Sequence, residues 1–89
     1  MVRAYGTQGG QEVSWNYRVM QVDRKGQPHF EVHEVYYDPD GRPNGYMASP
    51  STPMGESLDE LREDLVAFLD AFRLPVLRPS DFPERPAAP

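Results

Sequence analysis

Residues 57–73 carry the pattern of a single amphipathic helix, and this stretch constrains the fold more than any other part of the chain. Ser57 and Glu60 have the spacing of a capping box, in which the Ser57 hydroxyl accepts from the third helical N–H and Glu60 reaches back to the Ser57 N–H. Pro75 is expected to end the helix near Arg73. The helix has an apolar stripe that needs a sheet to pack on, and its members are Leu58, Leu61, Leu65, Phe68, Leu69 and Phe72.

The residues before the helix alternate between apolar and polar side chains, which predicts β-strands. Residues 13–22 and 29–37 are expected to form a hairpin around a polar turn that contains Gly and Pro, and a short third strand is expected at 46–49. In the first strand, one side carries Val13, Trp15, Tyr17 and Val19, and the other side carries Ser14, Asn16 and Arg18.

The second predicted strand changes phase along its length. Phe30 and Val32 share one face under strict alternation, whereas Val35 and Tyr37 share the other. We therefore expect a β-bulge near residues 33–34, because one extra residue would bring all four apolar side chains to the same face.

These elements predict an α+β fold, a three-stranded antiparallel β-meander with one amphipathic helix packed on one face, in the order β-β-β-α. We expect a single domain over residues 13–77, after a flexible leader at 1–12 and before a proline-rich disordered tail at 78–89. Neither end offers enough apolar surface to offset the entropy of ordering it. Residues 74–77 could return along the sheet as an extended segment or a short extra strand.

The composition argues against several classes of function. The chain has no cysteine, which excludes disulfides and thiolate metal sites and fits a cytoplasmic protein. No apolar stretch approaches the roughly 20 residues that cross a bilayer, so we expect no membrane partner. A net charge of −5 disfavours nucleic acid as a partner, because phosphate-binding surfaces gather Lys and Arg.

No set of residues has the pattern of a catalytic or cofactor site, so we expect a non-enzymatic protein with no catalytic residue, no metal and no cofactor. His29 and His33 would lie about 13 Å apart on a regular strand, too far to share a metal ion. Asp38 and Asp40 stand in a Pro-Asp-Gly segment, which is more typical of a turn than of a calcium loop with so few oxygen ligands.

A small-ligand site is the alternative hypothesis. The expected bulge would gather polar and aromatic side chains, namely His33, Glu34, Tyr36 and Tyr46. Such a site would make the domain a ligand-binding or enzymatic one, and it predicts a displaced titration of a histidine or a carboxylate.

The helix gathers carboxylates in its first half, where they favour the positive end of the helix dipole. As a partner-binding surface this cluster comprises Glu56, Asp59, Glu60, Glu63 and Asp64. We expect a protein partner, either a small basic protein or a second copy of the chain, bound through this cluster or through an open sheet edge. A related hypothesis is that the cluster mimics nucleic acid toward a basic protein.

The run Gly45-Tyr46-Met47-Ala48-Ser49-Pro50, followed by Gly55-Glu56-Ser57-Leu58-Asp59-Glu60-Leu61, resembles the strand, proline-containing loop and helix start of HicB-type antitoxins. In that family the N-terminal domain is a partial RNase H-like β-β-β-α unit without catalysis, which binds and blocks a small toxin ribonuclease. The resemblance therefore implies the same order of elements and an antitoxin-like interaction module whose partner is a small toxin-like protein.

Overall fold

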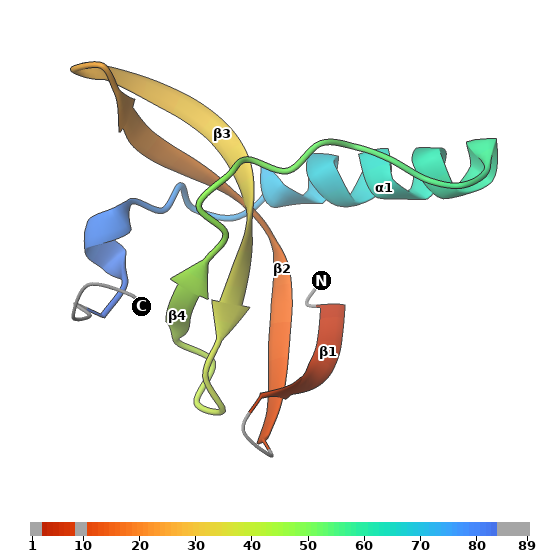
Figure 1. Ribbon diagram of the computed structural model, residues 1–89, viewed down its shortest axis with the longest axis horizontal. Coiled ribbons are helices and arrows are strands. Elements are labelled where there is room, and N and C mark those ends of the chain that lie inside the picture. Colours follow the sequence, from red (N-terminus) through yellow and green to blue (C-terminus); the bar gives the residue numbers. More distant parts are fainter. Residues whose placement is uncertain (1–2, 9–10, 84–89) are drawn as a thin grey trace.

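The computed structural model describes residues 3–8 and 11–83 of the chain. One antiparallel sheet has the order β1-β2-β3-β4, and its strands are β1 (Arg3–Gln8), β2 (Gln11–Arg24), β3 (Gln27–Tyr37) and β4 (Pro43–Tyr46). The helix α1 (Leu58–Ala71) and the short 3-10 helix η1 (Pro79–Asp81) follow (Figure 1). The predicted α+β fold is confirmed, because β2, β3, β4 and α1 form the β-β-β-α unit.

A further strand, β1, lies inside the segment that the sequence predicts to be a flexible leader. It pairs with β2 from Arg3 opposite Trp15 to Gln8 opposite Gln11, with a register shift between Ala4 and Gly6. An edge strand is held by backbone hydrogen bonds and needs few apolar side chains. The prediction of a flexible leader rested on the lack of apolar side chains and therefore missed this strand. Residues 1–2 and 9–10 of the predicted leader lie outside the described residues.

The β2–β3 hairpin is a long, regular ladder. Its turn places Lys25 at φ 56° and Gly26 at φ 79°, the two positive values that a two-residue type I′ turn requires. The register runs unbroken from Arg24 opposite Gln27 to Ser14 opposite Tyr37. The predicted bulge at residues 33–34 is therefore wrong, and the irregularity in β3 falls between Tyr36 and Tyr37, on the side that pairs with β4.

Without a bulge, β3 keeps the phase change that the sequence shows, and the structure accommodates it by exposing one end of the strand. Phe30 is 61% exposed near the hairpin tip, whereas His33, Val35 and Tyr37 are buried on the other side of the sheet. The fully buried His33 thus lies on the side of β3 to which the predicted bulge would have brought Phe30 and Val32.

The third strand of the predicted meander comes three residues earlier than expected, at Pro43–Tyr46. The Asp38 carboxylate accepts from the backbone N–H groups of Asp40 and Arg42, both at 2.9 Å, and Gly41 has φ 83°. This tight turn lets the chain extend again at Pro43. The expectation that Asp38 belongs to a turn is confirmed.

The main core lies on the face of the sheet that we call the core face, which carries Met20, Val35, Tyr37 and Leu77. On β2 this is the side of Asn16, Arg18 and Met20, opposite to the side of Tyr17 and Val19 that the sequence favoured. Alternation along β2 does not reveal which side the rest of the chain covers. The C-terminal segment supplies that cover.

Residues 74–77 do return along the sheet. Leu77 forms a parallel bridge with Met20, in which the Leu77 N–H donates to the Val19 carbonyl at 3.0 Å and the Gln21 N–H donates to the Leu77 carbonyl at 2.8 Å. The segment is thus extended and joined to β2 by a single bridge, and the alternative of a short extra strand is wrong.

The predicted disordered tail begins with an ordered turn. In η1 the Arg78 N–H donates to the Asp81 carboxylate at 2.7 Å, and the Phe82 ring lies 4.8 Å from the Tyr46 ring, centroid to centroid. One aromatic side chain thus anchors residues 78–83 to the sheet. Residues 84–89 lie outside the described residues.

Replacing Phe82 tests whether this anchor stabilises the domain. We expect Phe82→Ala to lower the free energy of unfolding by about 1–2 kcal/mol, because a half-buried aromatic contact with Tyr46 is lost. Urea denaturation measures the change. The matched control is Phe30→Ala, whose exposed ring should change stability by less than about 0.5 kcal/mol. Equal effects of the two substitutions would contradict the docked tail.

Candidate functional site

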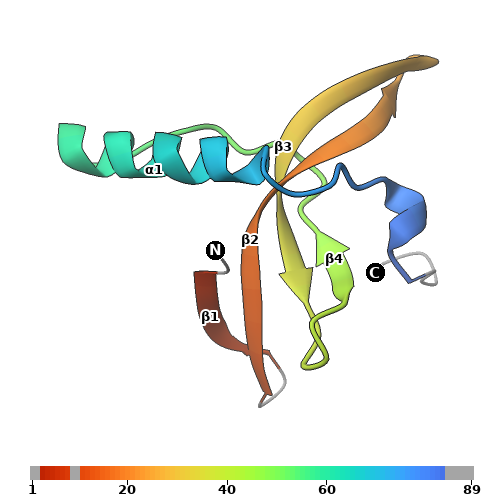
Figure 2. The same ribbon diagram turned by 180° about the vertical axis from the view of Figure 1, so that it is seen from behind.

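The helix α1 protrudes from the sheet instead of lying flat on it. Figures 1 and 2 show from opposite sides that its C-terminal end crosses the sheet while its N-terminal end reaches away from it. The contacts with the sheet are made mainly with β2, where the Phe68 and Tyr17 rings lie 4.5 Å apart. The sequence prediction of one helix packed on one face of the sheet holds for this part of α1 only.

The greater part of the predicted apolar stripe has no sheet beneath it. Four side chains that recur at spacings of seven, four and three residues form one stripe, which we call the outer face: Leu58 is 71% exposed, Leu65 45%, Leu69 67% and Phe72 69%. Leu61 and Phe68, the other two members of the predicted stripe, are partly buried. The prediction that packing on the sheet satisfies the whole stripe is wrong.

A buried carboxylate sets this rotation of the helix. The Tyr17 hydroxyl donates to Asp64 Oδ1 at 3.0 Å, and the Met54 N–H donates to Asp64 Oδ2 at 3.0 Å. Asp64 is 9% exposed, so one of the helix residues that face the sheet and the loop is an aspartate. The apolar stripe lies to one side of this contact and is therefore left partly uncovered.

The loop before α1 folds back along the first turn of the helix. A Cβ atom added to Gly55 would lie 2.5 Å from the Leu61 backbone nitrogen and 2.7 Å from Glu60. Only glycine allows so close an approach. The Glu60 N–H donates to Ser57 Oγ at 3.1 Å, as the capping box predicts, but the Glu60 carboxylate accepts from the Glu56 N–H at 2.9 Å instead of the Ser57 N–H.

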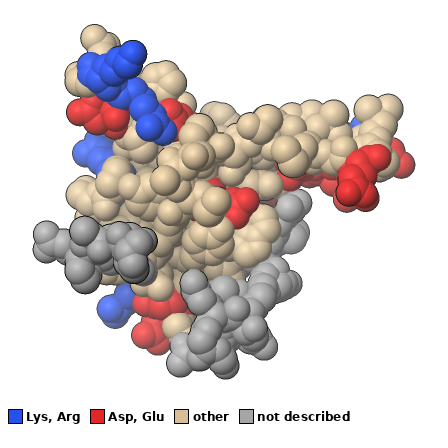
Figure 3. All heavy atoms as spheres, in the orientation of Figure 1, with Lys and Arg blue, Asp and Glu red and all other residues tan. Residues whose placement is uncertain are grey.

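The five carboxylates predicted as a partner-binding cluster have different roles. Asp64 is turned inward, and Glu60 accepts from the backbone of Glu56. Asp59 pairs with Arg62 at 2.9 Å on the surface, and Glu63 lines a cavity beside β2. Figure 3 shows that acidic side chains gather at the protruding end of α1, whereas basic ones mark the tip of the β2–β3 hairpin.

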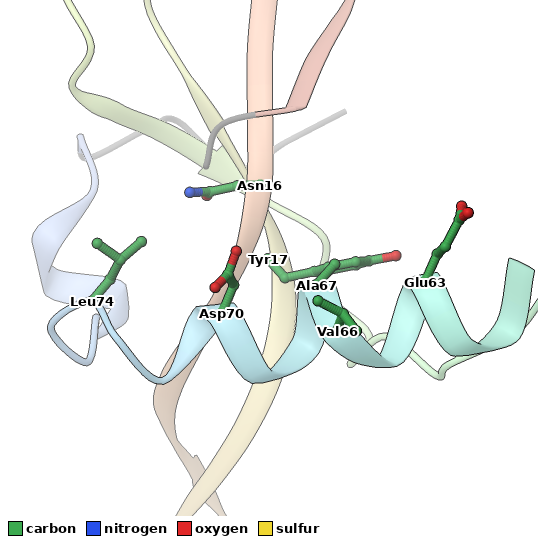
Figure 4. Close-up of a pocket in the computed structure, with 7 residues that line it drawn as sticks. All are labelled: Asn16, Tyr17, Glu63, Val66, Ala67, Asp70 and Leu74. Atoms are coloured by element: carbon green, nitrogen blue, oxygen red, sulfur yellow. The ribbon is translucent and has the colours of Figure 1, made fainter.

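A cavity of about 210 Å³ lies between α1 and β2, on a different side of the helix from the outer face. Figure 4 shows its lining, which combines three aliphatic side chains, two carboxylates, an amide and a phenol: Val66, Ala67, Leu74, Glu63, Asp70, Asn16 and Tyr17. A space of this size accommodates one side chain or a few water molecules. Sequence reasoning missed it, because the cavity exists only through the angle at which α1 leaves β2.

The predicted ligand site is divided between the two faces of the sheet. His33 and Tyr46 lie on the core face, with ring centroids 5.8 Å apart in an edge-to-face arrangement. Glu34 and Tyr36 lie on the opposite face, where the Tyr36 hydroxyl donates to the Glu34 carboxylate at 2.6 Å. Burial, together with this carboxylate, raises the pKa of Tyr36 to about 12. Without the bulge, strict alternation keeps the two pairs apart.

Glu31 is the centre of a polar cluster that the sequence analysis did not single out. Arg24 donates to both of its carboxylate oxygens, at 2.7 and 2.9 Å, and ring nitrogens of His29 and His33 each lie 2.9 Å from one oxygen. The hydrogen bond from Arg24 is the main reason that the pKa of Glu31 lies well below its usual range, and His33 and His29 add to it against the opposing effect of burial.

His33 itself is held on both sides. Its Nδ1 lies 2.7 Å from the Met47 carbonyl and its Nε2 lies 2.9 Å from Glu31, while the side chain is fully buried. The ring therefore ties the start of the loop after β4 to β3. This arrangement describes a structural histidine that no solvent or ligand reaches.

A second buried network fastens the C-terminal segment to β2. Arg18 donates to the Tyr37 hydroxyl at 2.8 Å and to the Pro75 carbonyl at 2.7 Å, and the Tyr37 hydroxyl donates to Asn16 at 2.7 Å. The sequence pattern placed Arg18 on the polar side of β2, but that side is the core face. The buried Arg18 guanidinium thus connects β3 to the segment that follows α1.

The described residues contain no group of three or more histidine, cysteine, aspartate or glutamate side chains placed to hold a metal ion. Within the same part of the chain, none of the helices has the length and apolar character needed to cross a membrane. Comparisons with protein-family models, with characterised proteins and with solved structures give no match to the chain.

The Tyr17–Asp64 contact can be tested by a double-mutant cycle. We expect Asp64→Ala to lower the free energy of unfolding by about 1–3 kcal/mol, because Tyr17 and the Met54 N–H lose a charged acceptor. Tyr17→Phe keeps the ring against Phe68 and removes only the hydroxyl. A coupling energy of about 0.5 kcal/mol or more between the two substitutions is expected, and additive effects would contradict the contact.

Glu31 should make stability depend on pH. Its folded-state pKa lies below the unfolded value of about 4.3, so protonation favours the unfolded chain, and the contribution present at neutral pH is lost as the pH falls. We expect Glu31→Gln to lower the free energy of unfolding by about 1–3 kcal/mol near neutral pH. The difference in free energy of unfolding between Glu31→Gln and the wild type should become smaller as the pH falls. Urea denaturation at a series of pH values from neutral to acid measures this difference.

The control for this experiment is Asp59→Asn, which removes one carboxylate from an exposed surface pair with Arg62. Its effect should stay below about 1 kcal/mol at every pH, because solvent screens such pairs. A constant gap between the wild type and Glu31→Gln at all pH values would contradict the role given to Glu31.

Proposed function

We propose that the protein is a non-enzymatic interaction module that binds another polypeptide through the outer face of α1. The observation that carries the proposal is the exposure of Leu58, Leu65, Leu69 and Phe72 on one stripe of a protruding helix. Together they expose on the order of 500 Å² of largely apolar surface, near the upper end of the largest patches on monomeric proteins. Patches of that size are often functional.

The length of α1 supports the same proposal. The helix has 14 residues, and isolated helices of that length are marginal in water. Its C-terminal half packs on β2 through Phe68, whereas its N-terminal half is supported by its cap and by the loop around Gly55. A polypeptide bound to the outer face would bury the apolar side chains along the whole length of α1.

The carboxylates at the protruding end of α1 add a charge preference to the proposal. Glu56, Asp59 and Glu60 are exposed near the start of the helix, so cationic groups are favoured in the part of a partner that reaches this end. Asp64, which the sequence analysis included in this cluster, acts inside the molecule. The acidic cluster therefore enters the proposal as the acidic end of α1, and the apolar outer face carries the binding.

Two hypotheses from the sequence relate to this proposal differently. The resemblance to HicB-type antitoxins stays a prediction, and an antitoxin-like role would be one form of the proposed function. The small-ligand alternative receives no support from the geometry, because His33 and Tyr46 lie on one face of the sheet and Glu34 and Tyr36 on the other.

Site-specific photo-crosslinking in the native lysate tests the proposal. A photoreactive residue at position 69 should form an adduct with a definite polypeptide, which is either another protein or the same chain, and one at position 30 should not. The identified polypeptide, purified, should bind the wild type at least about tenfold more tightly than Leu65→Glu/Leu69→Glu.

The matched control adds the same two carboxylates at exposed apolar positions away from α1, in Phe30→Glu/Met47→Glu. Both double variants should remain folded by circular dichroism, since all four side chains are exposed, and the control should bind within about twofold of the wild type. Equal adducts at positions 69 and 30, or unchanged affinity of the α1 variant, would overturn the proposal.

A further inference from the structure

We infer that the polypeptide that covers the outer face is a second copy of this chain, packed so that the two α1 helices run antiparallel. This inference rests on the proposed function and names its partner. It is carried by the spacing of the outer-face residues, by the distribution of charge along α1 and by the position of the sheet relative to the helix.

The outer face is symmetric about its middle. Leu58, Leu65 and Phe72 follow one another at intervals of seven residues, with Leu65 at the centre. In an antiparallel pair related by a two-fold axis at Leu65, each Leu65 meets its own copy and each Leu58 meets Phe72 of the other helix. Leu69 then faces the half-buried Leu61, so every outer-face side chain has an apolar neighbour.

Charge favours the antiparallel over the parallel arrangement. The first half of α1 carries Asp59, Glu60 and Glu63, and a parallel pair would place two such sets side by side. An antiparallel pair separates them and brings the first turn of each helix toward Arg73 of the other chain, which follows α1, is 80% exposed and pairs with Asp70 at 3.5 Å. The two helix dipoles also oppose each other in this arrangement, which is favourable.

The position of the sheet also favours antiparallel helices. The sheet crosses α1 at its C-terminal end, and the other end of the helix is clear of the strands in both views (Figures 1 and 2). Antiparallel helices place the two sheets at opposite ends of the pair. Parallel helices would bring both sheets to the same end, where they compete for space.

The area involved is sufficient for a weak dimer. Two outer faces bury on the order of 1,000 Å² in total, close to the lower limit for specific interfaces. We therefore expect a dissociation constant in the micromolar range, so that the monomer and the dimer are both populated at concentrations used in solution.

Sedimentation equilibrium of the full chain tests the self-association. We expect a monomer–dimer equilibrium for the wild type and for Phe30→Glu/Met47→Glu, and a monomer for Leu65→Glu/Leu69→Glu. Added salt should leave the dimer intact or strengthen it, since it screens the repulsion between two chains of net charge −5. A wild type that is still monomeric at about 500 μM would overturn the inference, because a dimer with a micromolar dissociation constant would predominate there.

Disulfide trapping tests the orientation, because the chain has no cysteine of its own. Under mild oxidation, Leu65→Cys should form a disulfide dimer with itself, since its two Cα atoms meet at the axis. Leu58→Cys and Phe72→Cys should each form no disulfide dimer alone and should form a mixed disulfide when combined. Disulfide dimers of Leu58→Cys alone and of Phe72→Cys alone, with no mixed product, would show parallel helices and overturn the inference.

The two proposals fail in different ways. If the adduct at position 69 is a different protein and the wild type is monomeric, the second-copy inference is overturned and the proposed function stands. If no polypeptide is trapped at position 69 and the wild type is monomeric, both are overturned. A dimer that Leu65→Glu/Leu69→Glu fails to dissociate would contradict the outer face as its interface.

Discussion

The hydrogen bonds to the Asp64 carboxylate determine how the helix meets the sheet. A charged group in this position is retained because the Tyr17 hydroxyl and the Met54 N–H both donate to it, and a buried carboxylate with two such donors holds its place firmly. Once Asp64 faces inward, Phe68 follows it onto Tyr17, and Leu65 and Leu69 turn outward. The exposure of the outer face thus goes with the rotation of α1 that buries Asp64.

The sequence predicted the elements better than it predicted their contacts. The capping box at Ser57 and Pro75 beyond the helix located α1, because these signals act on the chain locally. The sequence also showed that the apolar residues of β3 change from one face to the other. The prediction of a bulge rested on the assumption that all large apolar side chains are buried. The structure instead exposes Phe30 and buries His33, whose ring finds acceptors in Glu31 and the Met47 carbonyl.

The face of the sheet that becomes the core was not predictable from β2 alone. The pattern favours the side of Trp15 and Tyr17, but the choice depends on Leu77 and Phe82, which reach the opposite side from the far end of the chain. Arg18 is buried for the same reason, since the Pro75 carbonyl that accepts its hydrogen bond arrives with that segment. The outer face could be recognised as an apolar stripe, but its exposure depends on Tyr17 and Met54, which no pattern within the helix contains.

The regular β2–β3 ladder has a consequence for the order in which the molecule assembles. Its pairs begin at the Lys25-Gly26 turn and close outward one after another, so each new contact needs only a short loop to form. The bridge between Met20 and Leu77 joins segments much farther apart in sequence and can add only when the ladder presents an edge to receive it. The hairpin is therefore the natural nucleus of folding, and the C-terminal segment is the step that closes the core.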